Sequence, residues 1–130
     1  MSNQSLLEEL YTSIQQDLHG LGDDVAHLQV HGNRVLASNS VDGLTVDVDE
    51  TDDGIAAQIT VNEGYKVSRP VHMCFGLLPE EGLQHIQLQV NIRPEARIGI
   101  LAHCTFPNAV NVRHLMDANI VVEAGAEYSY

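Results

Sequence analysis

Basic residues are scarce in this sequence of 130 residues. Six lysines and arginines stand against 18 aspartates and glutamates, which gives a formal net charge of −12. A surface of this charge repels phosphate backbones and anionic lipid head groups. The composition therefore argues against nucleic acid and membrane surfaces as binding partners.

Cysteine is rare, and long apolar runs are absent. The two cysteines are too few for a disulfide framework. The apolar runs span only a few residues, whereas a membrane-spanning helix needs about 20. The first residues, MSNQSLLEEL, contain neither the basic stretch nor the continuous apolar stretch of a secretory signal. We therefore expect a cytoplasmic protein with reduced thiols.

Sequence templates of common catalytic sites are also missing. There is no Gly-rich phosphate loop, no GxSxG elbow and no HExxH motif. The acidic residues are spread along the chain, which is typical of a solvated surface. Asp117, an isolated acid beside Met116, is interpreted as a turn-capping carboxylate. We expect that the protein is not an enzyme.

The length and the 44% hydrophobic content fit one globular domain with its own core. Ser5 and Glu8 have the spacing of a helix-capping box. Apolar residues then recur at helical intervals up to Leu18, before Gly20 and Gly22. This pattern predicts an amphipathic helix over residues 6–18, within an amino-terminal segment of residues 1–22.

Residues 23–54 are predicted to form a hairpin and capping strands. The apolar runs Ala26–Val30 and Arg34–Ala37 flank His31-Gly32-Asn33, whose glycine and asparagine tolerate positive φ. Leu44–Val48 alternates between apolar and polar residues, as a third strand does. From Ile55 onward, helical periodicity appears only weakly, near Leu115 and Met116.

Residues 55–130 show repetition with a period near 30. Three similar strand-turn-strand units begin at Val61, Val90 and Val122, and other markers recur at nearly the same interval: Cys74 with Cys104, Pro79 with Pro107, and His85 with His114. Short strands at such a period, without crossover helices, predict coils that stack as parallel strands in a β-solenoid. A β-sandwich is the competing architecture, since it explains the alternation but not the shared interval.

Cysteines and histidines in these coils are the candidate ligands. Stacking at one period predicts that Cys74 and Cys104 lie on adjacent rungs, about 4.8 Å apart. His72 shares a face with Cys74, whereas His103 and Cys104 point to opposite faces. His72, Cys74 and Cys104 are therefore a candidate ligand set for an iron-sulfur cluster or zinc. The alternative is that both cysteines are small buried hydrophobic residues.

Histidines beyond His72 also recur in these coils. His114, with His103, is included among the candidate metal ligands. His85 and His114 are expected to stack one above the other, with a structural rather than a catalytic role.

Several segments resemble the SufB/SufD family, which assembles iron-sulfur clusters. They are Pro70–Gly82, Ala102–Val110, Val112–Ala118 and Glu123–Tyr130. The resemblance implies a right-handed parallel β-helix that acts as a scaffold for a nascent, transiently bound iron-sulfur cluster. It also implies association with a SufC-type ATPase subunit and with a second SufB/SufD-type subunit.

Members of that family continue beyond the point that resembles Glu127–Tyr130, so this chain resembles an amino-terminal part of one. An end at this point exposes a coil edge with unpaired backbone groups and apolar side chains such as Val121, Ala126 and Tyr128. We therefore expect self-association through this edge.

Two other functions remain open. One is a structural module, similar to SufD, that stabilises an assembly complex and holds no cluster. The other is a metal-dependent, cupin-like protein, suggested by seven histidines in an acidic, β-rich chain. That class predicts two consecutive histidine motifs, which the sequence does not contain.

Overall fold

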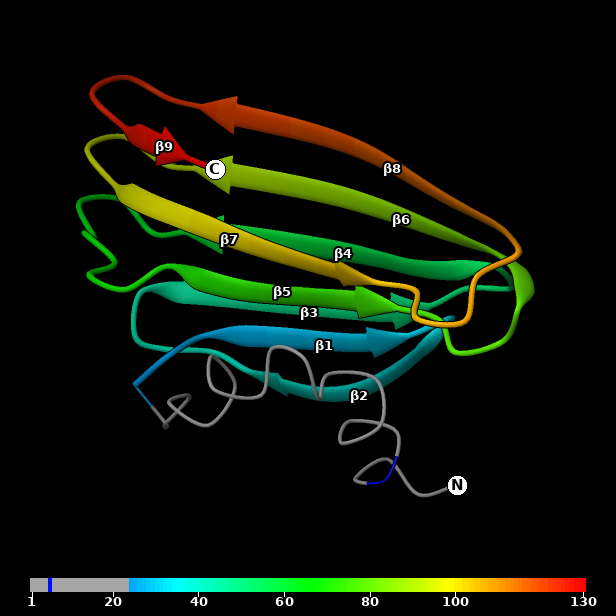
Figure 1. Cartoon of the computed structure of the whole chain (residues 1–130). Helices are drawn as coiled ribbons and strands as arrows, with labels where there is room; N and C mark the ends of the chain where they lie inside the picture. The colour runs from blue at the N-terminus through cyan, green and yellow to red at the C-terminus, as the bar shows by residue number, and fades with distance from the viewer. Residues whose placement is uncertain (1–4, 6–23) are drawn as a thin grey trace.

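A computed structural model describes residue 5 and residues 24–130 of the chain (Figure 1). The predicted helix of residues 6–18 lies outside these described residues. The elements of the described part are strands, with these bounds: β1 His27–His31, β2 Arg34–Asn39, β3 Leu44–Glu50, β4 Gly54–Val61, β5 Val71–Gly76, β6 Glu81–Ile92, β7 Arg97–Thr105, β8 Asn111–Val122 and β9 Glu127–Ser129. This part contains no helix of the length and apolarity needed to cross a membrane.

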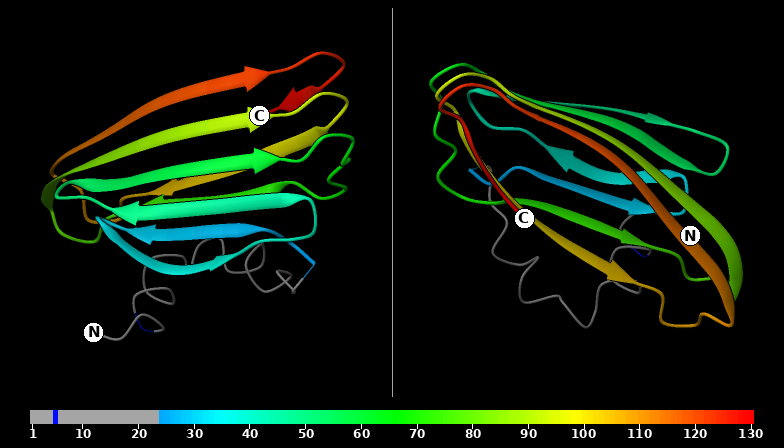
Figure 2. Two further views of the ribbon diagram at one scale, coloured as in Figure 1. Left: turned by 180° about the vertical axis from the view of Figure 1, so that it is seen from behind. Right: turned by 90° about the horizontal axis from the view of Figure 1, so that it is seen from above.

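The strands form two facing sheets. The first has the order β2-β1-β5-β7-β9 and the second the order β3-β4-β6-β8. Figures 1 and 2 show the two sheets as two layers, and in Figure 1 the arrows of β4, β6 and β8 point opposite to those of β5 and β7. Successive strands from β4 onward alternate between the layers, so each repeat of the sequence contributes one strand to each sheet.

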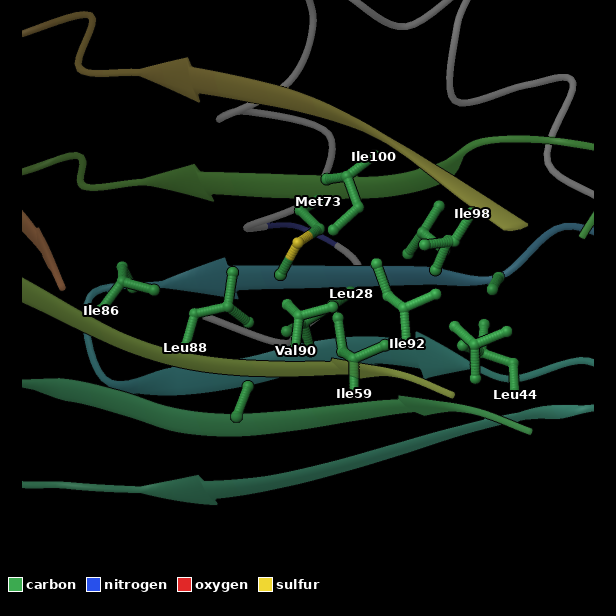
Figure 3. Packing of buried hydrophobic residues seen from close by; sticks show 14 of the residues in the cluster. Leu28, Leu44, Ile59, Met73, Ile86, Leu88, Val90, Ile92, Ile98 and Ile100 are labelled. Carbon is green, nitrogen blue, oxygen red and sulfur yellow. The ribbon is translucent and has the colours of Figure 1, made fainter. Parts of the chain in front are cut away.

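The hydrophobic core lies between the sheets. Strand β4 buries every second residue, Ile55, Ala57, Ile59 and Val61, and β6 does the same with Ile86, Leu88, Val90 and Ile92. The opposite sheet contributes Leu28, Val30, Val71, Met73, Phe75, Ile98 and Ile100. Figure 3 shows side chains of this core pointing into the space between the layers. The period-2 alternation visible in the sequence is therefore the alternation between core and outer face.

Parallel pairing joins equivalent segments of successive repeats. In the second sheet Ile55 pairs with Ile86, and Ile86 with Met116. In the first sheet Val71 pairs with Ile100, and Ile98 with Tyr128. Among these strand pairs from β4 onward, the partners lie farthest apart along the chain between β4 and β6. The offset is one residue smaller between β6 and β8, and one residue smaller again between β5 and β7. The antiparallel pairs are β1 with β2 and β3 with β4.

Three turns stack at one end of the layers. In each, an amide donates to the carbonyl three residues earlier: Tyr65 to Asn62, Ala96 to Arg93, and Ala126 to Glu123. The third residue of each turn has positive φ: 79° at Gly64, 63° at Glu95 and 71° at Gly125. Gly64 N donates to Pro94 O, and Glu95 N to Ala124 O, so each turn is hydrogen-bonded to the next. Two of the three positions carry glycine, which adopts positive φ without strain.

Several predictions for the fold are confirmed. The described chain is mainly β, β1 and β2 form the expected hairpin around Gly32, and β3 is the expected third strand. The weak helical pattern near Leu115 and Met116 was misleading, because both residues lie within β8. An all-antiparallel sandwich is excluded for the described residues, since both sheets are mixed.

Strands β8 and β9 form the last rung of the two layers, as Figure 2 shows. Val90 and Ile92 on β6 are fully buried, but Ile120 and Val122, which pair with them on β8, are 36% and 46% exposed. The rows of core side chains on β4 and β6 therefore continue onto β8, where the apolar side chains lie at an open edge of the sheet.

Candidate functional site

The loop between β7 and β8 carries the chain from one sheet to the other. It stacks on the equivalent loop between β5 and β6: Val110 N and Asn111 N donate to Glu80 O at 2.8 and 2.9 Å, and Asn108 Nδ2 donates to Leu78 O at 3.0 Å. These bonds fix the loop, and with it the end of β7 and the start of β8, against the loop of the previous repeat.

Cys104 and His114 meet across this loop. Cys104 lies near the end of β7 and His114 near the start of β8, and the distance from Cys104 Sγ to His114 Nε2 is 3.9 Å. The imidazole ring lies against Phe106 and Phe75, with ring centroids 5.3 and 6.2 Å apart. Cys104 is exposed, so the pair is accessible from solvent.

Gln84 supports the histidine from the neighbouring strand. It pairs in register with His114, and its Oε1 lies 2.9 Å from His114 Nδ1. Its Nε2 donates to Gly32 O at 3.0 Å and to Gly76 O at 3.1 Å. Gln84 is fully buried, which is unusual for a glutamine and requires that its amide be hydrogen-bonded.

The surroundings favour the neutral forms of both groups. Partial burial raises the pKa of the Cys104 thiol and lowers the pKa of the His114 imidazole. Desolvation produces both shifts, because it disfavours whichever form is charged. At neutral pH the site is therefore a thiol beside a neutral imidazole.

A sulfur and an imidazole nitrogen at this separation can share a thiophilic cation. Metal-sulfur and metal-nitrogen bonds of about 2.3 and 2.05 Å at a tetrahedral angle place the two donors about 3.6 Å apart. The observed 3.9 Å is near that value. Two donors occupy only part of a tetrahedral shell, so a cation held here keeps positions for other ligands.

The structure does not place Cys74 and Cys104 on one ladder, and that expectation is wrong. Cys74 pairs with His103, and Cys104 pairs with Phe75. The offset between β5 and β7 is one residue shorter than the interval between the cysteines, and a one-residue slip moves a side chain to the other face. Neither cysteine is in a disulfide, and Cys74 is buried whereas Cys104 is exposed.

The predicted set of Cys74, Cys104 and His72 is consequently not assembled. His72 and Cys74 lie on the outer face of their sheet, since the alternate residues Val71, Met73 and Phe75 belong to the core. His103 joins them there, its ring stacked on that of His72 with centroids 6.0 Å apart. Within residue 5 and residues 24–130, no group of three or more His, Cys, Asp or Glu side chains is arranged to hold a metal ion.

His85 and Asp117 differ from expectation as well. His85 pairs with Leu115 and not with His114, so the two histidines do not stack. Asp117 does not cap a turn: it lies within β8, with its Oδ2 2.6 Å from His85 Nε2. Asp53 Oδ2 lies 3.8 Å from the other ring nitrogen of His85. These groups form a local polar contact on the outer face, away from the pair of Cys104 and His114.

Gln84 was not among the residues predicted for the site. A lone glutamine in an alternating strand carries no signal of its own. A signal was available in the repeat, since Gln84 and His114 lie one repeat apart, as register partners of β6 and β8 do. His85, which was predicted to stack on His114, is one residue out of register with it.

Two known proteins are similar to the chain over most of its length. An iron-sulfur cluster assembly SufBD family protein of Methanocaldococcus jannaschii is 31% identical over 122 residues, which cover 92% of this chain. A protein of the same description from Pyrococcus horikoshii is 28% identical over 124 residues, or 95% of this chain.

The chain spans 38% of the length of each of these relatives. No protein-family profile matches the chain, and no solved structure is significantly similar to it. Two of the segments that suggested the family, Pro70–Gly82 and Ala102–Val110, contain β5, the end of β7 and the loops that follow them, beside the thiol and the imidazole. Both relatives are described as iron-sulfur cluster assembly SufBD family proteins, and their similarity over most of this chain supports its membership of the SufB/SufD family.

Proposed function

We propose that this chain is a scaffold component in iron-sulfur cluster assembly, and that Cys104 and His114 are its contribution to binding iron or the nascent cluster. Both relatives carry the description of iron-sulfur cluster assembly proteins. The observation that carries the proposal is the 3.9 Å approach of Cys104 Sγ to His114 Nε2 at an exposed position. Thiolate and imidazole are both known ligands of iron-sulfur clusters.

In this role the protein is not an enzyme. Its residues provide ligands and position them, and a cluster is cargo that passes to another protein. The two donors leave the cargo partly uncovered, which suits a transient complex. Nucleotide hydrolysis then belongs to a SufC-type ATPase subunit. Co-purification of the intact protein with the SufC-type ATPase of the same genome tests that partnership, and an ATPase that never co-elutes contradicts it.

Anaerobic reconstitution with Fe²⁺ and sulfide tests the ligands. We expect visible absorbance and a Mössbauer signal from the wild type, and loss of most of both in Cys104→Ser and His114→Asn. Cys74→Ser is the matched control, because Cys74 is a buried thiol on the other face of the sheet. Equal cluster content in all four proteins contradicts the proposed site.

The alternative is a structural module that holds no cluster. It is distinguished by the same experiment, since the wild type then binds no thiol-dependent iron while still associating with its partners. The accessible pair of Cys104 and His114 favours the ligand-bearing role over this alternative.

We also propose that the coils belong to a right-handed parallel β-helix, and that the edge formed by β8 pairs with another SufB/SufD-type subunit or with a second copy of the chain. The parallel pairing of strands one repeat apart, in both sheets, supports this architecture. The exposed Ile120 and Val122 continue the core columns of β6, so a further strand placed on β8 buries them.

Sedimentation velocity tests whether the chain associates through the edge formed by β8. We expect concentration-dependent association of the wild type and a shift to monomer in Val122→Lys, because a charge at an inward edge position opposes pairing. Val110→Lys introduces the same charge at a loop residue that is 76% exposed, and serves as the control. A wild type that stays monomeric at high concentration contradicts self-association.

A further inference from the structure

The amide of Gln84 has a fixed orientation. Its Nε2 lies 3.0 Å from Gly32 O and 3.1 Å from Gly76 O, and both of these are carbonyl oxygens that only accept hydrogen bonds. Flipping the amide, so that its nitrogen and oxygen exchange places, would put Oε1 against two oxygens and leave a buried NH₂ group facing the imidazole. The network therefore assigns the nitrogen to the carbonyls and the oxygen to His114.

This orientation determines which nitrogen of His114 carries the proton. The Gln84 Oε1 is an acceptor, and it lies 2.9 Å from His114 Nδ1. A hydrogen bond at this distance requires Nδ1 to be the donor. A neutral imidazole has one N–H, so Nε2 then carries a lone pair. That lone pair is on the nitrogen nearest Cys104 Sγ, at 3.9 Å.

The ring has little freedom to escape this arrangement. Phe106 and Phe75 lie against it, and Gln84 itself is fully buried and tied to the turn after β1 and the end of β5. The hydrogen-bonded chain thus runs from two backbone carbonyls of the first sheet, through Gln84 on β6, to the imidazole on β8.

We infer that Gln84 is a positioning residue that holds His114 in the Nδ1–H tautomer, so that the pair of Cys104 and His114 receives a thiophilic divalent cation through Sγ and Nε2. The inference rests on the proposed ligand role of the pair and adds the residue that prepares it. As the cation binds, the thiol proton passes to solvent and the sulfur and nitrogen lone pairs form two bonds to the metal. No electron is transferred. Residues that orient a metal-binding imidazole through its other nitrogen commonly affect affinity by about 10- to 100-fold.

Nitrogen-15 NMR of the metal-free protein tests the tautomer directly. Two-bond ¹H–¹⁵N correlation spectra distinguish protonated from unprotonated ring nitrogens, and His114→Asn identifies the signals of His114. At a pH above about 7.5, where imidazoles are neutral, we expect a protonated Nδ1 and an unprotonated Nε2 in the wild type. A protonated Nε2 in the wild type overturns the inference, whatever the variants do.

Gln84→Met tests the positioning role. It removes the acceptor while keeping a similar side-chain length, and we expect His114 to lose its tautomer preference and Zn²⁺ affinity to fall by about 10- to 100-fold. Gln89→Met is the control: Gln89 lies on the outer face of the same strand and contacts Asn91 and Asn119, not a histidine. A folded Gln84→Met protein that keeps a protonated Nδ1 and wild-type Zn²⁺ affinity overturns the role of Gln84.

The outcomes also separate this inference from the proposed function. If the Nδ1–H tautomer and Zn²⁺ binding are found but no iron-sulfur cluster can be reconstituted, the proposed function fails and the tautomer assignment stands. If clusters form on Cys104 and His114 while Nε2 is protonated in the metal-free protein, the inference fails and the proposed function stands.

Discussion

Cys74 pairs with His103 where β5 runs beside β7, and both side chains lie on the outer face of the sheet. The next pair, Phe75 and Cys104, faces the other way. This register gives the two thiols of the protein different chemical surroundings. Cys74 is fully buried, and Cys104 is exposed beside an imidazole. Their different surroundings should give the two thiols different reactivities.

Thiol labelling should distinguish the two cysteines. We expect the native protein to release one equivalent of chromophore with Ellman's reagent, from Cys104, and the unfolded protein to release two. Cys104→Ser should then react only after unfolding. Mild oxidation should give no internal disulfide, because the cysteines are not register partners. Rapid native labelling of Cys74, or an internal disulfide found by mass spectrometry, contradicts the observed register.

Replacing Glu95 by glycine should stabilise the fold. Glu95 is the residue with positive φ in the middle one of the three stacked turns, where its neighbours have Gly64 and Gly125. A non-glycine residue in this region costs about 1 to 2 kcal/mol. The greater freedom of glycine in the unfolded chain offsets part of this gain, so we expect Glu95→Gly to raise the free energy of unfolding by about 0.5 to 1 kcal/mol.

Urea unfolding measures this change, and two variants control it. Glu95→Ala keeps a Cβ at positive φ and should give no such gain. Gly125→Ala should destabilise the protein, since its Cβ would meet the Glu95 carboxylate in a backbone conformation with φ of 71°. Equal stabilisation by Glu95→Gly and Glu95→Ala would show that the side chain, not the backbone, is the source.

Equivalent core positions should differ in their contribution to stability. Ile59, Val90 and Ile120 form one column across β4, β6 and β8, yet Ile59 is fully buried and Ile120 is 36% exposed. We expect Ile59→Ala to lower the free energy of unfolding by about 2 to 5 kcal/mol. For Ile120→Ala we expect about 1 kcal/mol in the monomer, because much of that side chain already contacts water.

Denaturant unfolding at low and high protein concentration measures both. If β8 pairs with a second copy, the cost of Ile120→Ala should grow with concentration while that of Ile59→Ala does not. A large, concentration-independent cost for Ile120→Ala contradicts the open edge.

Acidification should destabilise the protein through its histidines. Burial lowers the pKa of His114, and burial together with the nearby His72 lowers the pKa of His27, both from an ordinary value of 6.5. The unfolded chain therefore binds protons more readily than the folded one. The stability linked to these groups is present above pH 6.5 and is lost as the pH falls through the lowered values.

Thermal unfolding at about pH 8 and about pH 5.5, on either side of the ordinary histidine pKa, measures the effect. We expect the wild type to have the lower Tm at the acidic pH. His27→Gln and His114→Asn should each show a smaller difference between the two conditions. A wild-type Tm that rises on acidification contradicts the assigned direction of the shifts.

Much of the fold follows from local sequence signals. Gly32 and Asn33 between two apolar runs predicted the first hairpin, and the alternation in Leu44–Val48 predicted β3. The recurrence of strands and tight turns at one period predicted the parallel pairing of segments from Ile55 onward. These signals are local because backbone preference and side-chain alternation are set by neighbouring residues.

The exact register was not predictable in the same way. Loops of unequal length make the offset between partners differ by one or two residues from one strand pair to another. Conspicuous markers such as the two cysteines and the pair His85 and His114 suggested intervals that differ from the true offset by one. An error of one residue is enough to exchange the core face for the outer face.

By itself, then, the sequence determined the β class, the turns, the repeat and the family likeness, because each of these depends on residue types at short or regular spacing. The tertiary structure alone decided which side chains meet. Cys104 meets His114 because one loop stacks on the loop below it. Gln84 orients that histidine because the carbonyl of Gly32, in the turn after β1, and the carbonyl of Gly76, at the end of β5, converge on its amide. Such convergence depends on register and packing in three dimensions, which spacing along the chain does not encode.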